Sequence, residues 1–222
     1  MEEHIVRILD ISPLTHDVRR IRVEKPAGYQ FTPGQATEVA VNEGHWKEDR
    51  RPFTFTCLNE DPYLEFSIKI YSDHAGVTKK IGSLHAGDEL IIHDVWGAIQ
   101  YKGEGTFIAG GAGITPFIAI FRQLQKDGKI GNNRLLFANK TRQDIILNED
   151  FKAMLGKNFI NVLSNEKTEQ YDYGMITKDY LKEKIGDVSQ NFYICGPDPM
   201  VRAMQENLKE LGATESVITV EV

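Results

Sequence analysis

The sequence has little cysteine and no long hydrophobic run. Its two cysteines, Cys57 and Cys195, are too few for a four-thiolate iron–sulfur or zinc site, and reduced thiols suit a cytoplasmic protein. No apolar stretch approaches the roughly 18 residues that cross a bilayer, so no membrane span is expected. The acidic N-terminus runs directly into alternating sequence, which argues against a secretory signal.

An excess of positive charge is also missing. The 26 Lys and Arg against 32 Asp and Glu give a net charge of -6 at pH 7, whereas broad nucleic-acid binding needs a basic face. The histidines show no metal-ligand spacing, so no metal site is predicted. With 222 residues and 41% hydrophobic residues, the chain can bury a core in one large or two small domains.

The first hundred residues have the period-two alternation of strands separated by turn residues. Six such segments predict a small antiparallel β-barrel: EEHIVRILDI, DVRRIRVEK, QATEVAV, RPFTFTCL, YLEFSIKIY and DELIIHDV. One helical pattern over 76–87 interrupts them. Val77, Ile81 and Leu84 would share its buried face, and Gly87 would end it.

After about residue 103, apolar strands alternate with amphipathic helices, which predicts a parallel sheet covered on both faces. Turn residues over 98–104 mark a boundary. We therefore expect a barrel domain over 1–100 and an α/β domain over 101–222, with a ligand cleft between them as the default expectation.

The segment GGAGITP, residues 110–116, joins a buried strand to a helix. Its glycines allow backbone amides to approach a phosphate, although a tight turn without ligand has the same pattern. Pro116 stands where the dinucleotide fingerprint has its last glycine. Lys140 and Arg142, after the next strand, favour a phosphorylated ribose over a bare hydroxyl pair.

The segment YICGPDPM, residues 193–200, places Cys195 and Gly196 at the end of another apolar strand. Asp198 begins the following helix. Ligands of open α/β sheets bind at such strand ends, but a buried structural cysteine is an equally plain interpretation.

The segment RRPFTFTC, residues 50–57, puts Phe53 and Phe55 on one strand face and Thr54 and Thr56 on the other. Two arginines and a proline precede this alternation. Either the strand starts in solvent, or an aromatic ring, a hydroxyl and an arginine meet one ligand there.

Taken in order, the segments RPFT, GVT, GGAGITP and CGPDPM resemble the ferredoxin–NADP reductase superfamily over essentially the whole chain. The resemblance is greatest to compact bacterial flavodoxin/ferredoxin reductases without a fused iron–sulfur domain. It implies a flavin-binding barrel followed by a nicotinamide-nucleotide domain, which is the division that the periodicity indicates.

The resemblance implies that FAD binds to the barrel. Arg51 would pair with the pyrophosphate, Phe53 would lie on the flavin ring, and Thr54 would bond the reactive flavin nitrogen. Phenylalanine in place of the usual tyrosine removes a phenol and should weaken flavin retention. The remaining implied flavin contacts are Lys69, Ile70 and Tyr71 on one strand and Gly76, Val77 and Thr78 at a helix start.

The resemblance also implies where NADPH or NADH would bind. Cys195 and Glu221 would align the nicotinamide and, with Thr54, form the catalytic set. The other implied contacts are Gly111, Gly113, Thr115, Pro116, Lys140, Arg142, Gly196, Asp198 and Met200. Ser164-Asn165 stands where NADPH-selective relatives often carry Ser-Arg, so NADPH is favoured only slightly over NADH. Tyr171 or Tyr173 would stack on the adenine ring, or both tyrosines would be surface residues.

The implied function is hydride transfer from NAD(P)H to FAD, then single-electron transfer to a flavodoxin or ferredoxin, by a cytoplasmic monomer. One alternative is a flavin or ferric reductase, which Phe53 and the absence of a terminal aromatic residue favour. Another is a flavin-binding electron-transfer subunit that uses no nicotinamide. Arg50, Arg51, Lys69, Lys79 and Lys80 would form a basic patch for an acidic carrier.

Overall fold

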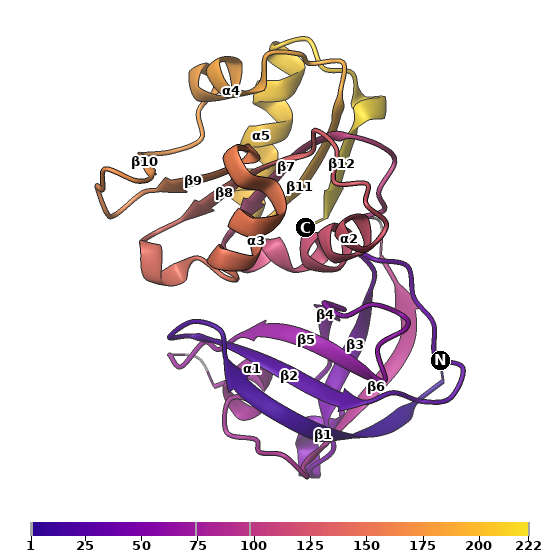
Figure 1. Cartoon of the computed structure of the whole chain (residues 1–222). Coiled ribbons are helices and arrows are strands. Elements are labelled where there is room, and N and C mark those ends of the chain that lie inside the picture. The colour runs from indigo at the N-terminus through magenta and orange to yellow at the C-terminus, as the bar shows by residue number, and fades with distance from the viewer. Residues whose placement is uncertain (1, 74, 98, 222) are drawn as a thin grey trace. The chain divides into compact units, whose positions relative to one another are not determined.

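The computed structural model describes residues 2–73, 75–97 and 99–221, without the side chain of Glu221. Its contacts divide the chain into two compact units, which are described separately below (Figure 1). The first unit holds residues 1–100 and 115–123, and the second holds 101–114 and 124–222. The segment 115–123 thus belongs by its contacts to the first unit, although the sequence pattern groups it with the second.

The first unit is the predicted antiparallel barrel. One six-stranded sheet runs in the order β4-β3-β6-β1-β2-β5. A bridge between Phe55 and Phe66 joins the chain just after β4 to β5 and closes this sheet on itself. The strands are β1 (His4–Pro13), β2 (Val18–Glu24), β3 (Ala36–Val41), β4 (Arg51–Thr54), β5 (Tyr63–Lys69) and β6 (Glu89–Trp96).

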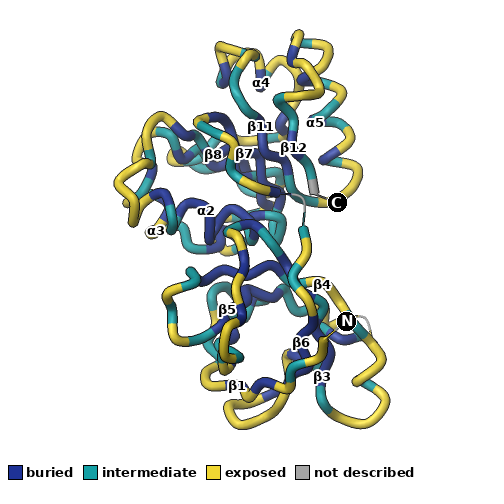
Figure 2. Tube along the Cα trace, turned by 90° about the vertical axis from the view of Figure 1, so that its right-hand side faces the viewer, coloured by how far each residue is buried: buried dark blue, intermediate teal, exposed yellow. Residues whose placement is uncertain are grey.

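Alternation along the strands decides which side chains enter the barrel core. On β1, Val6 and Ile8 are buried, whereas Ile5 and Leu9 are 61% and 49% exposed. Figure 2 shows the same change between buried and exposed positions along the barrel strands. The period of two therefore produces a strand with one inward and one outward face.

The predicted helix over 76–87 is shorter than expected. Helix α1 covers only Val77–Ile81, and Gly82 is its C-cap. A Cβ on Gly82 would lie 2.8 Å from Ile70 Cγ2, so a larger residue there would force the Ile70 side chain to shift. Val77, Ile81 and Leu84 are nevertheless all buried in the barrel core as predicted.

The second unit is the predicted parallel sheet, in the order β10-β9-β8-β7-β11-β12. Its strands are β7 (Gly105–Gly110), β8 (Arg134–Asn139), β9 (Phe159–Leu163), β10 (Asp172–Tyr173), β11 (Asn191–Cys195) and β12 (Ile218–Glu221). The helices that follow its strands are α2 (Thr115–Lys126), α3 (Asn148–Leu155), α4 (Lys178–Ile185) and α5 (Asp198–Glu210). The short strand β10 was not predicted; it has only two residues, too few for a periodic signal.

Apolar faces of α4 and α5 cover the sheet of the second unit. Leu181 of α4 and Val201 and Met204 of α5 pack with Ile108 and Ile194 of the central strands in one buried cluster. Every residue of β7 is buried, as expected for a strand in the middle of a covered parallel sheet (Figure 2).

The strand order reverses at β7. The chain first moves outward through β8 and β9, and then returns to place β11 on the other side of β7. In doubly wound sheets, ligands bind outside the carboxyl ends of the strands at this reversal.

Among the described residues, no helix has the length and apolar character needed to cross a membrane.

Candidate flavin and nicotinamide sites

Strand β4 carries three of the residues that were predicted to hold a flavin: Arg51, Phe53 and Thr54. Thr54 pairs with Ala36 and is only 8% exposed, yet its hydroxyl has no hydrogen-bond partner among the described residues. The Phe53 ring is half-buried and packs against the barrel core. Arg51 is exposed, and in the described part of the chain its guanidinium bonds only to the Arg50 carbonyl, at 2.6 Å. One four-residue strand thus offers an unused cation, a ring and an unused hydroxyl.

Arg50, a member of the predicted basic patch, has a local partner. Its Nη2 lies 2.9 Å from Glu3 Oε1, and the same carboxylate oxygen lies 3.2 Å from Nε2 of the buried His93. Arg50 therefore tethers the start of β4 to the N-terminal segment, whereas its neighbour Arg51 remains available to an anion.

The predicted flavin strand over 69–71 is partly engaged inside the barrel. β5 ends at Lys69, whose Nζ pairs with Asp17 Oδ2 at 2.9 Å. The Ile70 amide donates to the Asp17 carbonyl at 2.7 Å, so this amide is not available to a ligand. Tyr71 is 49% exposed, and it is the residue of this segment that is most open to a bound group.

The start of α1 has open space above its backbone. Gly76 precedes the helix in an extended conformation, and a Cβ placed on it would meet nothing within 4 Å. Val77 is buried and anchors the turn, while Thr78 is half-buried beside it. A group approaching these backbone amides would meet no side chain from Gly76.

The two glycine-containing segments of the second unit meet each other. A Cβ on Gly113 would lie 2.3 Å from the Cys195 carbonyl oxygen and 2.6 Å from Gly196 Cα. A Cβ on Gly110 would lie 2.5 Å from Met200 Sδ. The loop after β7 and the loop after β11 therefore touch through bare backbone at the point where the strand order reverses, and glycine is needed for that approach.

The remaining predicted residues of these loops lie beside this contact. Gly111 has a φ of +52°, in the left-handed region that glycine adopts readily. Thr115 and Pro116 begin α2, and Asp198 begins α5 with Pro199 in its first turn. Both helices start at the carboxyl end of a sheet strand, where their N-termini favour negative charge.

Register places two of the predicted catalytic residues opposite each other. β11 and β12 are parallel, and Cys195 pairs with Glu221. The predicted role of Glu221 depends on its side chain, which lies outside the described residues. The pairing concerns the backbone alone.

The residues that were predicted to favour NADPH lie after β8. Lys140 is exposed, and it has no ion-pair partner in the described ranges. Arg142 is already engaged: its Nε lies 3.1 Å from Glu166 Oε1, and its backbone amide donates to Glu166 Oε2 at 2.8 Å. The acidic partner of Arg142 has no signal in the sequence, because the two residues lie in different loops.

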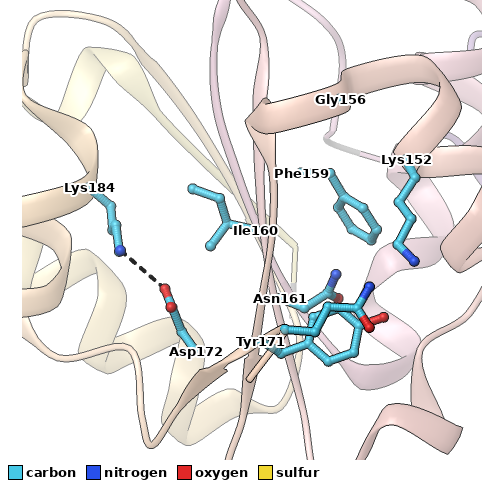
Figure 3. A pocket seen from close by; sticks show the side chains of 9 residues that line it. Lys152, Gly156, Phe159, Ile160, Asn161, Tyr171, Asp172 and Lys184 are labelled. Atoms are coloured by element: carbon cyan, nitrogen blue, oxygen red, sulfur yellow. Dashed lines mark ion pairs between the residues drawn. The ribbon is translucent and has the colours of Figure 1, made fainter. Parts of the chain in front are cut away.

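A cavity of about 380 Å³ lies at the β9 edge of the second unit (Figure 3). Tyr171, one of the two candidate adenine-stacking tyrosines, lines it, while Tyr173 is 59% exposed. Asn161 is 4% exposed, and its Oδ1 has no hydrogen-bond partner. The cavity is lined by Lys152, Gly156, Phe159, Ile160, Asn161, Gln170, Tyr171, Asp172 and Lys184.

A buried carboxylate was also missed. Glu65 on β5 is 1% exposed; Arg22 Nε lies 2.9 Å from its Oε2 and Arg122 Nη1 lies 2.7 Å from its Oε1. Thr56 Oγ1 donates to Glu65 Oε1 at 3.0 Å, which explains why the hydroxyl face after β4 is buried. Burial raises the pKa of Glu65, but Arg122 and the hydrogen bonds outweigh this effect and hold the pKa below its usual range.

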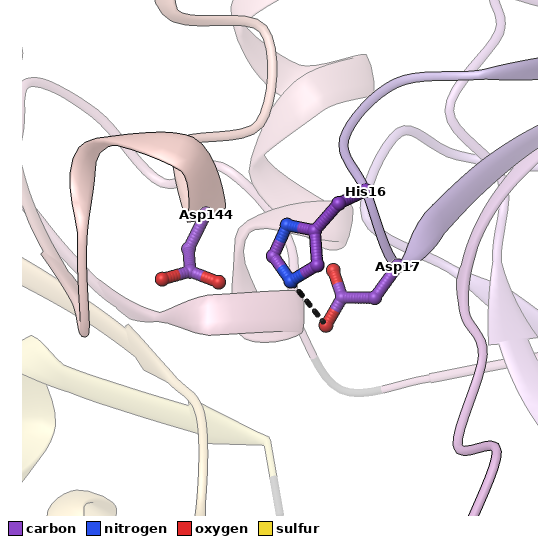
Figure 4. Close-up of side chains that lie close together, drawn as sticks. All are labelled: His16, Asp17 and Asp144. Carbon is purple, nitrogen blue, oxygen red and sulfur yellow. Dashed lines mark ion pairs between the residues drawn. The ribbon is translucent and has the colours of Figure 1, made fainter.

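Two further acids have local structural roles. His16 Nε2 lies 3.7 Å from Asp17 Oδ2 in the turn between β1 and β2 (Figure 4). Asp144, also drawn there, belongs to the second unit and closes a capping box with Thr141, whose amide and hydroxyl donate to Asp144 Oδ2 at 2.8 and 2.7 Å.

Comparison with known proteins identifies the same class of enzyme. Residues 107–206 match the family model "Oxidoreductase NAD-binding domain". NADH-cytochrome b5 reductase 1 of Aspergillus oryzae is 30% identical over 91% of this chain and 77% of its own length. The reductase component of propane 2-monooxygenase from Rhodococcus jostii is 28% identical over 96% of this chain, which spans 61% of that protein.

The fold comparison agrees. A ferredoxin NADP⁺ reductase from Neisseria gonorrhoeae, solved with bound FAD and NADP, superposes with a TM-score of 0.87 at 19% identity, covering 100% of this chain and 98% of the other. Together with the two-unit architecture and the segments on β4, β7 and β11, these similarities place the chain in one family. It belongs to the ferredoxin–NADP reductase superfamily and is an NAD(P)H-dependent flavoprotein oxidoreductase, with FAD as cofactor and a nicotinamide nucleotide as co-substrate.

Proposed function

We propose that this protein takes hydride from NAD(P)H and delivers single electrons to a separate carrier protein such as a flavodoxin or ferredoxin. In this proposal residues 1–100 bind FAD and residues 101–222 bind the nicotinamide nucleotide. Bound FAD supplies the chemistry that links a two-electron donor to a one-electron acceptor. The observation that carries the proposal is that the single strand β4 presents a guanidinium without an acidic partner and a hydroxyl without a hydrogen-bond partner in the described ranges.

The residues of β4 fit a flavin. Arg51 has no carboxylate partner in the described ranges, so its charge remains available to a pyrophosphate. The Thr54 hydroxyl has no hydrogen-bond partner in the described ranges, so it remains able to bond a ligand atom. Phe53 contributes a ring face, while its packing against the core limits how far the ring can turn.

The residues of the second unit fit a nucleotide with a pyrophosphate. The bare backbone around Gly111 and Gly113 leads into α2, where a helix N-terminus favours an anion. In the proposal Thr115 and Pro116 fix that helix start, and Gly196, Asp198 and Met200 form the facing wall. Cys195 and Glu221, neighbours across β11 and β12, would orient the nicotinamide ring.

The choice of acceptor rests on the relatives. One relative is named for cytochrome b5 and another as the reductase component of a monooxygenase. Each of these names describes a reductase that passes electrons to a separate protein. A dedicated carrier is therefore the acceptor class that we propose here.

The proposal is tested by reconstituting the purified protein with FAD and mixing it with NADH or NADPH under anaerobic conditions. Loss of the oxidised-flavin absorbance, followed by reduction of added flavodoxin or ferredoxin, is the expected result. Failure of both nucleotides to bleach the flavin would instead favour an electron-transfer subunit that uses no nicotinamide.

The variant Arg51→Ala tests the flavin assignment. Loss of a charge-assisted contact to pyrophosphate should weaken FAD binding by about tenfold or more, with the fold intact. Flavin content and circular dichroism measure the two effects. Arg50→Ala is the matched control, because Arg50 already pairs with Glu3; equal flavin content in the Arg51 variant and the wild type would contradict the assignment.

A second candidate function is reduction of free flavin or ferric complexes by a protein that holds FAD loosely. It is favoured by Phe53, whose ring has no hydroxyl to bond a flavin. Gel filtration in FAD-free buffer separates the candidates. A protein that keeps its flavin supports the carrier reductase, and a colourless protein that turns over only with added flavin supports the alternative.

A further inference from the structure

We infer that the Glu166 carboxylate occupies the position of a 2′-phosphate and makes NADH, rather than NADPH, the preferred nucleotide. This inference rests on the proposed use of a nicotinamide nucleotide and assigns one side chain to its selectivity. It also reverses the slight preference for NADPH that Lys140 and Arg142 suggested from sequence.

The location follows from the sheet. β8 and β9 are parallel neighbours, and their last residues, Asn139 and Leu163, pair with each other. The loops that follow are joined by backbone hydrogen bonds from Ser164 to Asn139, at 3.0 Å, and from Asn165 to Lys140, at 2.9 Å. In doubly wound sheets the adenosine ribose lies outside this edge, near the end of the strand that follows the glycine-rich turn.

Glu166 contacts two groups of one residue, through a hydrogen bond and an ion pair. Its Oε2 accepts from the Arg142 backbone amide at 2.8 Å, and its Oε1 lies 3.1 Å from Arg142 Nε. A backbone amide and a guanidinium at the start of a short helical turn are the donors that a phosphate would take. The Glu166 side chain is 26% exposed and that of Arg142 is 68% exposed, so the carboxylate forms the inner part of the pair.

A second acid takes the adjacent donors. The amide and hydroxyl of Thr141 both donate to Asp144 Oδ2, within the same turn. The amides of Thr141 and Arg142 are therefore both bonded to carboxylates before any ligand arrives. The basic side chains that remain nearby are the exposed Lys140 and Lys167, each on a flexible stem.

The chemistry then separates the two nucleotides. A 2′-phosphate carries more than one negative charge and would have to displace Glu166 from Arg142 or lie against it. A ribose 2′-hydroxyl can instead donate a hydrogen bond to the same carboxylate, which keeps its hydrogen bond from the Arg142 amide and its ion pair with the Arg142 guanidinium. The arrangement therefore favours the nucleotide without the phosphate.

The test compares binding of NAD⁺, NADP⁺ and 2′,5′-ADP to the full chain by calorimetry, which needs no turnover. The wild type should bind NAD⁺ more tightly than NADP⁺. Glu166→Gln keeps the shape but removes the charge, and it should tighten binding of NADP⁺ and 2′,5′-ADP by about tenfold. Kinetics with NADH and NADPH on the FAD-loaded protein should change in the same ratio.

Two further variants complete the test. Adding Arg142→Ala to Glu166→Gln should remove the gained affinity for the phosphate, because Arg142 is the group that was released. Glu169→Gln, an exposed acid in the same loop, is the matched control and should leave the NAD⁺ to NADP⁺ ratio unchanged.

Two results would overturn the inference. A wild type that prefers NADP⁺, or a Glu166→Gln variant whose ratio equals the wild-type ratio, would reject the role of Glu166 while leaving the proposed function intact. If the wild type binds neither dinucleotide and neither reduces the flavin, the proposed function fails, and the inference fails with it.

Discussion

At the scale of residues, the ion-pair partner of each charged side chain is visible in the structure but not in the sequence. Arg50 and Arg51 are adjacent and identical in type, but Arg50 is held by Glu3 and Arg51 has no acidic partner in the described ranges. A step of one residue at the start of β4 thus separates a structural arginine from a candidate ligand-binding one.

Glu65 provides a stability test at the same scale. Glu65→Gln removes the charge that two half-buried arginines share, and we expect the free energy of unfolding to fall by about 2–3 kcal/mol at pH 7. Urea titration measures this change. Glu43→Gln, which removes the exposed carboxylate that pairs with Lys80, should cost less than about 0.5 kcal/mol.

The pH dependence of this effect has a definite sign. The folded pKa of Glu65 lies below the unfolded value of 4.5, so the unfolded state binds more protons between the two values. The carboxylate therefore stabilises the fold fully above about pH 4.5 and less as the pH falls through the folded pKa. The wild type should lose more stability than Glu65→Gln between pH 7 and about pH 3; parallel loss in both would contradict the ionised Glu65.

At the scale of elements, the contact between the loops after β7 and β11 constrains the choice of residue. Its backbone approach leaves no room for a side chain at Gly113, although Gly113 and Cys195 lie far apart in the chain. The loop glycines were recognisable from sequence as a possible phosphate cradle. Their second purpose, close packing between two loops, was not.

Gly113→Ala should disturb both purposes. A Cβ placed 2.3 Å from the Cys195 carbonyl oxygen forces the loops apart, and we expect a loss of about 1–3 kcal/mol in stability. Nucleotide binding should weaken by about tenfold or more, because both loops are proposed to contact the nucleotide.

Thermal unfolding and calorimetry with NAD⁺ measure the two effects. Gly76→Ala is a suitable control, because a Cβ there meets nothing within 4 Å and the backbone is extended. If Gly113→Ala has the melting temperature and the nucleotide affinity of the wild type, the contact between the loops contributes neither to stability nor to nucleotide binding.

At the scale of the whole molecule, charge bears on the choice of partner. The net charge is -6, and the predicted basic patch is largely neutralised by local acids. Arg50 pairs with Glu3, Lys69 with Asp17 and Lys80 with Glu43, at 2.9, 2.9 and 2.7 Å. Within the described residues, Arg51 and Lys79 are the members of the patch without an ion pair.

We therefore expect carrier docking to depend only weakly on salt. Between low and physiological ionic strength, kcat/KM for an acidic carrier should fall by about threefold or less, since few unpaired cations face it. Stopped-flow reduction of flavodoxin over a salt series measures this slope, with a neutral quinone as the control acceptor. A fall of tenfold or more would show that another basic surface guides docking.

The sequence by itself determined the class of each half of the molecule. A period of two implies a half-buried strand, and apolar strands alternating with amphipathic helices imply a covered parallel sheet, because these periods follow from backbone geometry alone. The order of RPFT, GVT, GGAGITP and CGPDPM likewise indicated the family. Boundaries were less well predicted: α1 ends at Ile81, with Gly82 as its C-cap, instead of near Gly87.

Only the tertiary structure decided which of the candidate residues are available to a ligand. Glu65 and Arg122 are 57 residues apart, and no local pattern marks them as partners. Arg142 is a residue type that suggests a phosphate site, but Glu166, in the loop after β9, pairs with its guanidinium. Charge can be read from a sequence, but whether that charge is already neutralised depends on which loops the fold brings within a few ångströms of each other.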